Sequence, residues 1–303
     1  MPIAVITFEF DPLLHLGDWS VRWETLAIGI AVLVGLIVAG VLAGRTSYPT
    51  HDAATPDAVD HLRADDVLLI ALGVVPGAVV GGRLAYAALH ADYYAVNGAA
   101  IVDPGTGGLA LSGAVVLGAL TGGLVARMFE APVGRWYGLA VIPMLLVLSL
   151  GKAANILGGT GQGLPSSMEW ATRYLGPGPW GSLGPDIPSS PAQAYEALGV
   201  GVLLVVFVVA RLLGSRVPGG RAFAIALGAW AAVRFTVAAT WRDPAVLGPL
   251  KAEQVLDLAI VALAIGLWVA LVVRTHRTTR PSVVPAPAAP ELDWPDPETR
   301  HRF

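Results

Sequence analysis

Residues 23–44 read WETLAIGIAVLVGLIVAGVLAG, a stretch in which Glu24 is the only charged side chain. A run of about 20 mostly apolar residues is long enough for an α-helix to cross the hydrocarbon core of a bilayer. Six further stretches of this kind follow, at residues 67–90, 109–128, 136–157, 191–213, 222–239 and 255–273. The sequence therefore predicts an all-α membrane protein with seven transmembrane helices.

The composition of the 303-residue chain agrees with this fold class. Hydrophobic residues make up 55% of the chain and charged residues 14%, whereas soluble domains carry roughly 25% charged residues. The formal net charge of −3 and the lack of a dense basic run argue against a nucleic-acid-binding protein. The chain has no cysteine, which excludes disulfides, thiolate metal sites and a thiol nucleophile supplied by the protein itself.

Lysines and arginines gather on one side of the predicted spans. With the side reached after the first span taken as inside, twelve of the nineteen fall inside. These twelve are Arg45, Arg63, Arg127, Arg135, Arg211, Arg216, Arg221, Arg274, Arg277, Arg280, Arg300 and Arg302. Because basic residues are enriched in cytoplasmic loops, we expect the N-terminus outside and the C-terminus in the cytoplasm. The first 20 residues lack the positively charged n-region of a signal peptide, so we expect no cleaved signal peptide.

The segments between the spans predict a simple domain organisation. Residues 1–280 are expected to form one transmembrane domain, whose outer loops at residues 91–108 and 158–190 are long enough to build a small head above the bilayer. Residues 281–303 are rich in Pro, Ala and acidic residues and lack periodicity. We expect them to be a disordered cytoplasmic tail, and removal of the chain after Arg280 should leave insertion and folding intact.

Three cations lie far from the cytoplasmic ends of the predicted spans, and a charged side chain costs roughly 2.5–3.5 kcal/mol at a helix centre. Arg83 and Lys152 each stand 16 residues into their spans, which places them roughly 24 Å from the cytoplasmic end at a rise of about 1.5 Å per residue. Arg234 stands 12 residues into its span, at roughly 18 Å. All three are therefore expected in the outer half of the membrane.

Other polar side chains are expected in the same layer, while the inner halves of the spans are almost purely aliphatic. These side chains are Arg22, Glu24, Ser112, Asn155, Gln193, Tyr195 and Glu196. Three cations with fewer acids suit an anionic headgroup, because arginine offers a planar fork to phosphate oxygens. We therefore predict one headgroup-sized cavity reached by both Arg83 and Arg234. The alternative is a set of structural ion pairs, such as Arg83 with Glu196.

Seven short motifs occur in order between Phe8 and Arg274. They are Phe10-Asp11-Pro12 with Val21-Arg22-Trp23, Gly81-Gly82-Arg83-Leu84-Ala85-Tyr86, Gly108-Leu109-Ala110-Leu111-Ser112-Gly113, Gly151-Lys152-Ala153-Ala154-Asn155, Pro191-Ala192-Gln193-Ala194-Tyr195-Glu196, Arg234 with Arg242-Asp243-Pro244, and Glu253-Gln254. Their order and spacing resemble the prolipoprotein diacylglyceryl transferase family. The resemblance covers nearly the whole chain apart from its tail.

The resemblance implies an enzyme of the bacterial plasma membrane. In that family a diacylglyceryl group moves from phosphatidylglycerol to the lipobox cysteine thiol of a secreted protein, and glycerol phosphate leaves. The thiolate is the nucleophile, and cations must neutralise the departing phosphate. The reaction needs neither a metal nor a diffusible cofactor. The headgroup-binding residues implied here are Arg83, Lys152, Asn155, Gln193, Tyr195 and Arg234.

Several positions depart from the family pattern. Ser112 replaces a histidine, Lys152 replaces an arginine, and Glu24 replaces a tyrosine. The family's Asn-Gly-Glu run, a glutamate and a further histidine are replaced by Gly158-Gly159-Thr160, Ala238 and Ser190 respectively. Serine cannot act as a base near neutral pH as histidine does.

The residues assigned to catalysis are therefore Glu24, Glu196 and Ser112, with one of the two glutamates accepting the proton. His90 is a further candidate, although a histidine at a helix end in the interface is the more ordinary interpretation. Three functions stay open: a divergent transferase, an inactive relative serving as a lipid-binding or structural subunit of a membrane complex, and a transporter of lipid or small anions. The transporter is disfavoured because its polar residues should reach both membrane faces.

Overall fold

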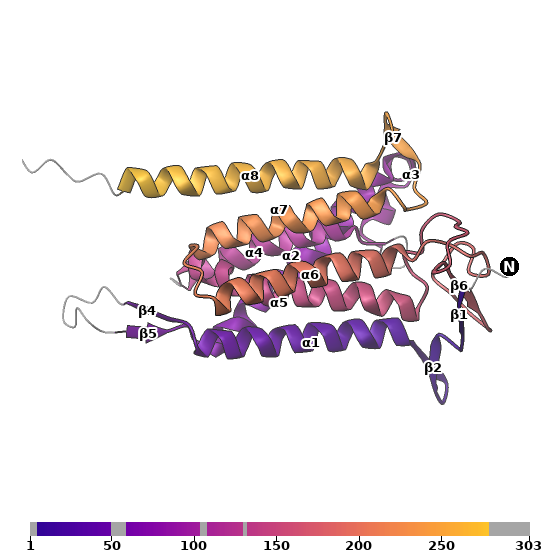
Figure 1. Ribbon diagram of the computed structural model, residues 1–303, viewed down its shortest axis with the longest axis horizontal. Helices are drawn as coiled ribbons and strands as arrows, with labels where there is room; N and C mark the ends of the chain where they lie inside the picture. Colours follow the sequence, from indigo (N-terminus) through magenta and orange to yellow (C-terminus); the bar gives the residue numbers. More distant parts are fainter. Residues whose placement is uncertain (1–4, 50–58, 104–107, 130–131, 279–303) are drawn as a thin grey trace, which may run out of the picture.

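The computed structural model describes residues 5–49, 59–103, 108–129 and 132–278, which form a bundle of long helices with small β elements at its ends (Figure 1). Seven of the described helices are long and apolar enough to cross a membrane, which confirms the predicted fold class. They are α1 (Trp23–Gly44), α2 (Ala64–Leu89), α4 (Leu111–Met128), α5 (Val133–Ala154), α6 (Ala192–Leu212), α7 (Gly219–Ala238) and α8 (Ala252–Thr278). The bounds of α1 coincide with the predicted span.

Close packing of α2 against α4 follows from glycines that line up on one face of α2. Gly73, Gly77 and Gly81 recur every four residues, and a Cβ atom at Gly81 would lie 2.3 Å from the carbonyl oxygen of Gly113. Such a contact leaves no room for a side chain, so the two backbones touch, as small residues allow between membrane helices. This contact fixes the position of Ser112, the neighbour of Gly113.

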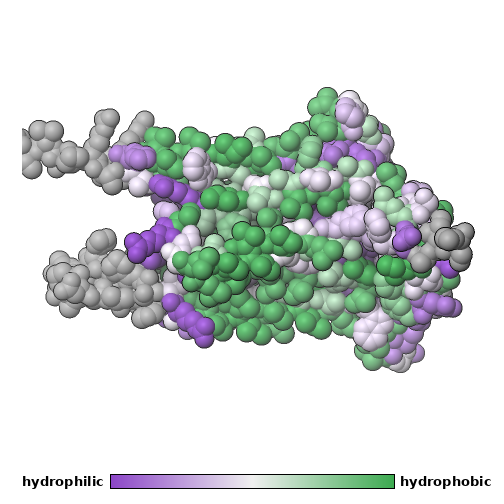
Figure 2. All heavy atoms as spheres, in the orientation of Figure 1, coloured by the Kyte–Doolittle hydropathy of each residue, from purple (hydrophilic) through white to green (hydrophobic). Residues whose placement is uncertain are grey.

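The surface of the bundle carries a broad hydrophobic band over the helices, with hydrophilic residues toward its ends (Figure 2). The core lies among α5, α6 and α7, where Leu145, Val200 and Trp230 are fully buried. Hydrophobic side chains therefore cover the outside of the long helices as well as the inside, which is the pattern of helices surrounded by lipid.

One end of the bundle carries a head made from segments far apart in sequence (Figure 1). The strand β1 (Ile6–Glu9) pairs in parallel with β6 (Thr172–Leu175), and β2 (Leu13–Leu16) forms a hairpin with β3 (Trp19–Arg22). The other elements at this end are α3 (Ala91–Val96), η1 (Gly98–Ile101), η2 (Asn155–Leu157), β7 (Ala245–Leu247) and β8 (Leu250–Lys251). The sequence predicted the two loops but not the strands, which are too short to show a period.

The opposite end of the bundle carries the hairpin of β4 (Ser47–Pro49) and β5 (Val59–His61). The helix α8 also ends there, at Thr278. The predicted disordered tail at residues 281–303 lies outside the described residues. Both the tail and the grouping of residues 1–280 into one domain stay predictions.

Candidate active site

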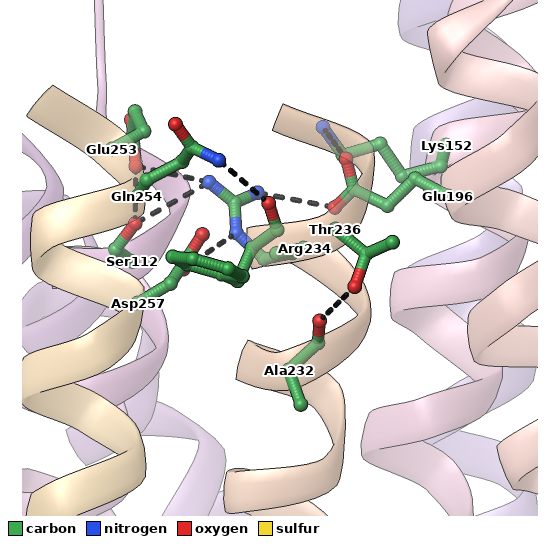
Figure 3. Close-up of polar contacts among 10 residues, drawn as sticks. Ser112, Lys152, Glu196, Ala232, Arg234, Thr236, Glu253, Gln254 and Asp257 are labelled. Carbon is green, nitrogen blue, oxygen red and sulfur yellow. Dashed lines mark hydrogen bonds and ion pairs between the residues drawn. The ribbon is translucent and has the colours of Figure 1, made fainter. Parts of the chain in front are cut away.

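Arg234 is the centre of a buried ion cluster near the head end of the bundle (Figure 3). Its side chain is 2% exposed. Its Nη1 donates to Glu196 Oε1 at 3.1 Å, its Nη2 to Glu253 Oε2 at 3.0 Å, and its Nε to Asp257 Oδ1 at 3.2 Å. Each nitrogen of the guanidinium group thus has a carboxylate partner.

The carboxylates come from two helices that flank α7. Glu196 lies in the first turns of α6, while Glu253 and Asp257 lie in the first turns of α8, one turn apart and hence on one face. The helix α7 packs along both α6 and α8. Because α7 ends at the head while α6 and α8 begin there, the acids at the start of those two helices meet Arg234 close to the end of α7.

Lys152 extends the cluster toward α5. Its Nζ lies 2.8 Å from Glu196 Oε2, and its side chain is 17% exposed, so it is more accessible than Arg234. The ring of Trp241 covers both cations, with its centroid 5.6 Å from Lys152 Nζ and 5.0 Å from Arg234 Cζ. Trp230 packs against Arg234 from within the core, at 5.3 Å. Aromatic faces attract both cations at this range.

Ser112 connects the cluster to an apolar pocket. Its Oγ donates to Glu253 Oε2 at 2.6 Å and accepts from Arg234 Nη2 at 3.4 Å. Ser112 and Gly113 line one side of a pocket of about 270 Å³, with Leu256 and Ile260 of α8 on the other. The pocket thus begins at the polar layer and continues between α4 and α8 along apolar side chains.

A second polar group surrounds Glu24 at the start of α1. Thr160 Oγ1 donates to Glu24 Oε2 at 2.9 Å, and Arg22 Nη2 lies 3.7 Å from the same oxygen. The Asn155 amide is oriented so that its nitrogen and its oxygen both have suitable hydrogen-bonding neighbours. In this orientation its nitrogen donates to Glu24 Oε1 at 3.2 Å. Lys152 and Asn155, three residues apart on one face, therefore link the Arg234 cluster to the Glu24 group.

Gln193 and Tyr195 face the head. Gln193 Nε2 donates to the Tyr174 hydroxyl at 3.0 Å, and Trp170 Nε1 donates to the Tyr195 hydroxyl at 2.6 Å. Burial raises the pKa of Tyr174 to about 12. Its hydroxyl therefore stays protonated at physiological pH and cannot serve as a base. Gln193 Oε1 is buried and accepts no hydrogen bond from the described residues.

Arg83 has a different environment. Its guanidinium donates to the carbonyl oxygens of Ala100 (2.5 Å), Ile101 (2.7 Å), Asp103 (2.9 Å) and Gly108 (3.3 Å). The alternative ion pair of Arg83 with Glu196 is wrong, because the ion-pair partners of Glu196 in the described chain are Lys152 and Arg234. A cavity shared by Arg83 and Arg234 stays a prediction.

His90 caps the end of α2 as an exposed residue. Its ring stacks on Tyr86 at a centroid distance of 4.1 Å, and its Nδ1 lies 2.9 Å from the Tyr86 carbonyl oxygen. These contacts agree with the more ordinary interpretation of a histidine at a helix end.

The expected surplus of positive charge is wrong for the Arg234 cluster. Two cations, Arg234 and Lys152, face three carboxylates, so the formal charge of the group is −1. The sequence interpretation missed Asp257, which is fully buried, and gave Glu253 no role. The signal was present, since Asp257 lies within the predicted span at residues 255–273 and a charge there needs a partner.

Comparison with known proteins agrees with this architecture. A model of the family described as prolipoprotein diacylglyceryl transferase matches residues 12–270. The chain belongs to the prolipoprotein diacylglyceryl transferase family. The match spans every site residue described above.

Relatives named phosphatidylglycerol–prolipoprotein diacylglyceryl transferase align over most of their length. The protein of Nostoc sp. is 27% identical over 295 residues, which cover 94% of this chain and 97% of the relative. The protein of Gloeobacter violaceus is 29% identical, over 88% of this chain and 96% of the relative. The protein of Beijerinckia indica is 30% identical, over 72% and 77% respectively. With seven apolar helices, this member of the diacylglyceryl transferase family is a multi-pass membrane protein.

Proposed function

We propose that this chain transfers the diacylglyceryl group of phosphatidylglycerol to the cysteine thiol of lipobox-containing secreted proteins. In this reaction the bond between a glycerol carbon and a phosphate oxygen breaks, a carbon–sulfur bond forms, and glycerol phosphate leaves. Family membership and the names of the relatives support the reaction class. The observation that carries the proposal is the apolar pocket that opens beside Ser112, within the layer that holds Arg234 and Lys152.

The two cations of this layer differ in solvent exposure, and we assign them different roles on that basis. Lys152 is the more exposed cation, and we assign it direct contact with the departing phosphate. Arg234 is enclosed by carboxylates and aromatic rings, and it would hold these groups in place while adding positive potential. Asn155, Gln193 and Tyr195 belong to the same proposed headgroup set, and the assignment of Arg83 to that set stays a prediction. The pocket between α4 and α8 would accept an acyl chain, since its walls are aliphatic.

The same proposal includes an orientation. The head end of the bundle would face the outside of the bacterial inner membrane, and the end that carries β4 and β5 would face the cytoplasm. The excess of Arg and Lys on the β4–β5 side supports this direction. A lipobox cysteine delivered from outside would then meet the polar layer through the head.

A transfer assay tests the proposal directly. Purified protein in micelles that contain phosphatidylglycerol is mixed with a lipobox peptide, and mass spectrometry detects the diacylglyceryl adduct. We expect Arg234→Lys, which keeps the charge but loses the fork that binds three carboxylates, to lower the rate strongly. We expect Lys152→Arg to retain or raise the rate, because a guanidinium binds phosphate with two parallel hydrogen bonds. Absence of adduct with folded wild-type protein would overturn the proposal.

The second candidate is a lipid-binding or structural subunit without catalysis. The observation that favours it is the full engagement of Arg234 by carboxylates, which leaves that guanidinium less able to take a phosphate. This candidate predicts phosphatidylglycerol that stays with the purified protein, no adduct, and loss of the lipid in Arg234→Lys. The lipid content and the adduct, measured on the same sample, separate the two functions.

A further inference from the structure

Among the three carboxylates around Arg234, Glu253 differs from its neighbours in exposure. The Glu253 side chain is 16% exposed, against 1% for Glu196 and 0% for Asp257. Glu253 also lies in the first turn of α8, where the helix leaves the head. It is therefore the carboxylate of the cluster that a substrate group can reach without moving the helices.

The two oxygens of Glu253 have different environments. Oε2 accepts both the Ser112 hydroxyl at 2.6 Å and Arg234 Nη2 at 3.0 Å. Oε1 accepts no hydrogen bond from the part of the chain that the structure describes. One oxygen thus fixes the orientation of the carboxylate while the other is left to take a proton. Arg234 Nη2 places a positive charge beside this carboxylate at 3.0 Å.

Ser112 places this carboxylate beside the proposed lipid. The serine is 2% exposed, and it lines the apolar pocket while bonding to Glu253. A glycerol headgroup whose acyl chain lies between α4 and α8 would therefore sit next to the Ser112–Glu253 pair. Serine acts here by holding the acid through a hydrogen bond, so it does not need to be a base itself.

We propose that Glu253 is the catalytic base, which accepts the proton of the lipobox cysteine thiol, and that Ser112 is its positioning residue. This inference rests on the proposed function. The S–H bond breaks and its proton passes to Glu253 Oε1, while the sulfur forms a bond with the glycerol carbon. The bond from that carbon to the phosphate oxygen breaks, and its electron pair leaves with glycerol phosphate. No oxidant, reductant or further reactant is needed.

The two glutamates named from the sequence fit this role less well. Glu196 bridges Lys152 and Arg234 with its two oxygens and is 1% exposed. The Glu24 side chain is 11% exposed, and its oxygens accept from Thr160 and Asn155 with Arg22 nearby. Each oxygen of these two carboxylates therefore already has a hydrogen-bond or ion-pair partner.

The test compares Glu253→Gln with Glu169→Gln, an exposed glutamate in the head that lies outside the site. A positioned base contributes roughly 10²–10⁴-fold, so Glu253→Gln should lower the transfer rate at pH 7 by at least about 100-fold. Its remaining rate should rise about tenfold per pH unit up to the thiol pKa of about 8.5, because solution ionisation replaces the base. Wild type and Glu169→Gln should show a flat profile over this range. The charged group in contact with Glu253 is Arg234 of α7. Arg234 also pairs with Glu196 of α6 and Asp257 of α8, which are the next charged groups of the cluster.

Two further variants separate a chemical role from a structural one. Glu253→Asp should recover part of the rate and the flat pH profile, since it restores a carboxylate. Ser112→Ala should lower the rate less, by roughly 3- to 10-fold, because the carboxylate loses one of two orienting donors. Unfolding temperatures of all variants are measured in the same detergent. If Glu253→Gln does not fold, the pH profile of Glu253→Asp is compared with that of wild type. A flat profile in both supports the base, and a profile of Glu253→Asp that rises with pH contradicts it.

A second readout does not depend on transfer. The lipobox peptide is alkylated with iodoacetamide at pH 7 in micelles that lack phosphatidylglycerol, with each variant present. Wild type should accelerate alkylation and Glu253→Gln should not. Transfer with a normal rate and pH profile in Glu253→Gln would overturn the inference and leave the proposed function standing. If wild type gives no transfer but its acceleration of alkylation depends on Glu253, the proposed function is overturned and the role of Glu253 as a base for the thiol stands. No transfer and no effect on alkylation would overturn both.

Discussion

Arg83 and Arg234 are the same residue type, each embedded in a transmembrane helix toward the head end, yet the structure gives them different partners. Arg234 binds three carboxylates from α6 and α8. Arg83 binds four backbone carbonyls in the segment that follows α2. Ion pairs hold Arg234 in place, whereas Arg83 holds the segment after α2 through hydrogen bonds to its backbone. The residue type and depth of an intramembrane cation therefore do not reveal its role.

The difference follows from what lies beside each guanidinium. The helices α6 and α8 begin next to Arg234, and their first turns supply acids. Arg83 instead lies near the end of η1, where its guanidinium donates to the carbonyl oxygens of Ala100 and Ile101, the last residues of that helix. A cation is the natural partner of carbonyls at a helix C-terminus. Tyr94 packs on the same guanidinium at 5.5 Å.

Removal of the Arg234 side chain should have the largest effect. Arg234→Ala strands three carboxylates in the bundle, and breaking a buried ion pair by removing one partner costs about 3–5 kcal/mol. We expect a large loss of thermal stability in detergent, measured by the unfolding midpoint. Arg234→Lys is the control that keeps the charge and should lose less. Equal stability of wild type and Arg234→Ala would show that the carboxylates do not need this cation.

Replacement of Arg83 should have a smaller and more local effect. Arg83→Gln loses charge-assisted hydrogen bonds to partly exposed carbonyls, which water can replace in part, so we expect a loss of about 1–2 kcal/mol. Hydrogen exchange should speed up in residues 91–103, while residues of α7 keep their protection. Loss of bound phosphatidylglycerol with unchanged exchange would assign Arg83 to the headgroup and break the contrast with Arg234.

Asp257→Asn tests the charge balance of the Arg234 cluster. It changes the formal charge from −1 to 0 and keeps the shape of the side chain. For a headgroup phosphate bound at a distance of about 8 Å, a unit charge contributes about 2 kcal/mol at an effective dielectric constant of about 20, before screening by salt. We expect roughly tenfold stronger retention of phosphatidylglycerol, measured as lipid per protein across a detergent wash. Asp186→Asn, at an exposed position in the head, is the control and should change nothing. Unchanged retention in Asp257→Asn would place the headgroup elsewhere.

The smallest effect is expected at Asp11, a partly exposed acid in the head that contrasts with both arginine sites. The backbone N–H of Leu13 donates to its carboxylate at 2.8 Å and, with a contribution from His15, holds the Asp11 pKa below its usual value. A lowered pKa means that the stabilisation is complete above the ordinary carboxyl range and is lost as the pH falls through the lowered value. NMR titration of the Asp11 carboxyl should show this midpoint, and Asp11→Asn should lower the unfolding midpoint slightly above pH 5, where wild type has the full stabilisation. A midpoint at or above the usual aspartate value would contradict the expectation.

The fold could be predicted largely from the sequence because the determinants are local. Apolar runs of membrane length gave seven spans, and the first agrees with α1 residue for residue. The strands β1 and β6 could not be predicted, since they pair residues 166 positions apart, such as Ile6 with Thr172, and have four residues each. Pairing at such a distance depends on how the helices bring the ends of the bundle together.

The sequence by itself determined that the chain spans a membrane, and it picked out Arg83, Lys152 and Arg234 as the cations in the outer halves of its spans. Hydropathy and helical rise fix the position of a residue along its helix, because both depend on neighbours in the chain. Only the tertiary structure decided which partners each cation has. Ser112 and Glu253 are 141 residues apart, and their contact depends on the rotation of α4 and α8 about their axes and on which helices are adjacent. Those choices are made by packing: the glycines of α2 permit a close helix contact, but their spacing does not specify that α4 is the partner.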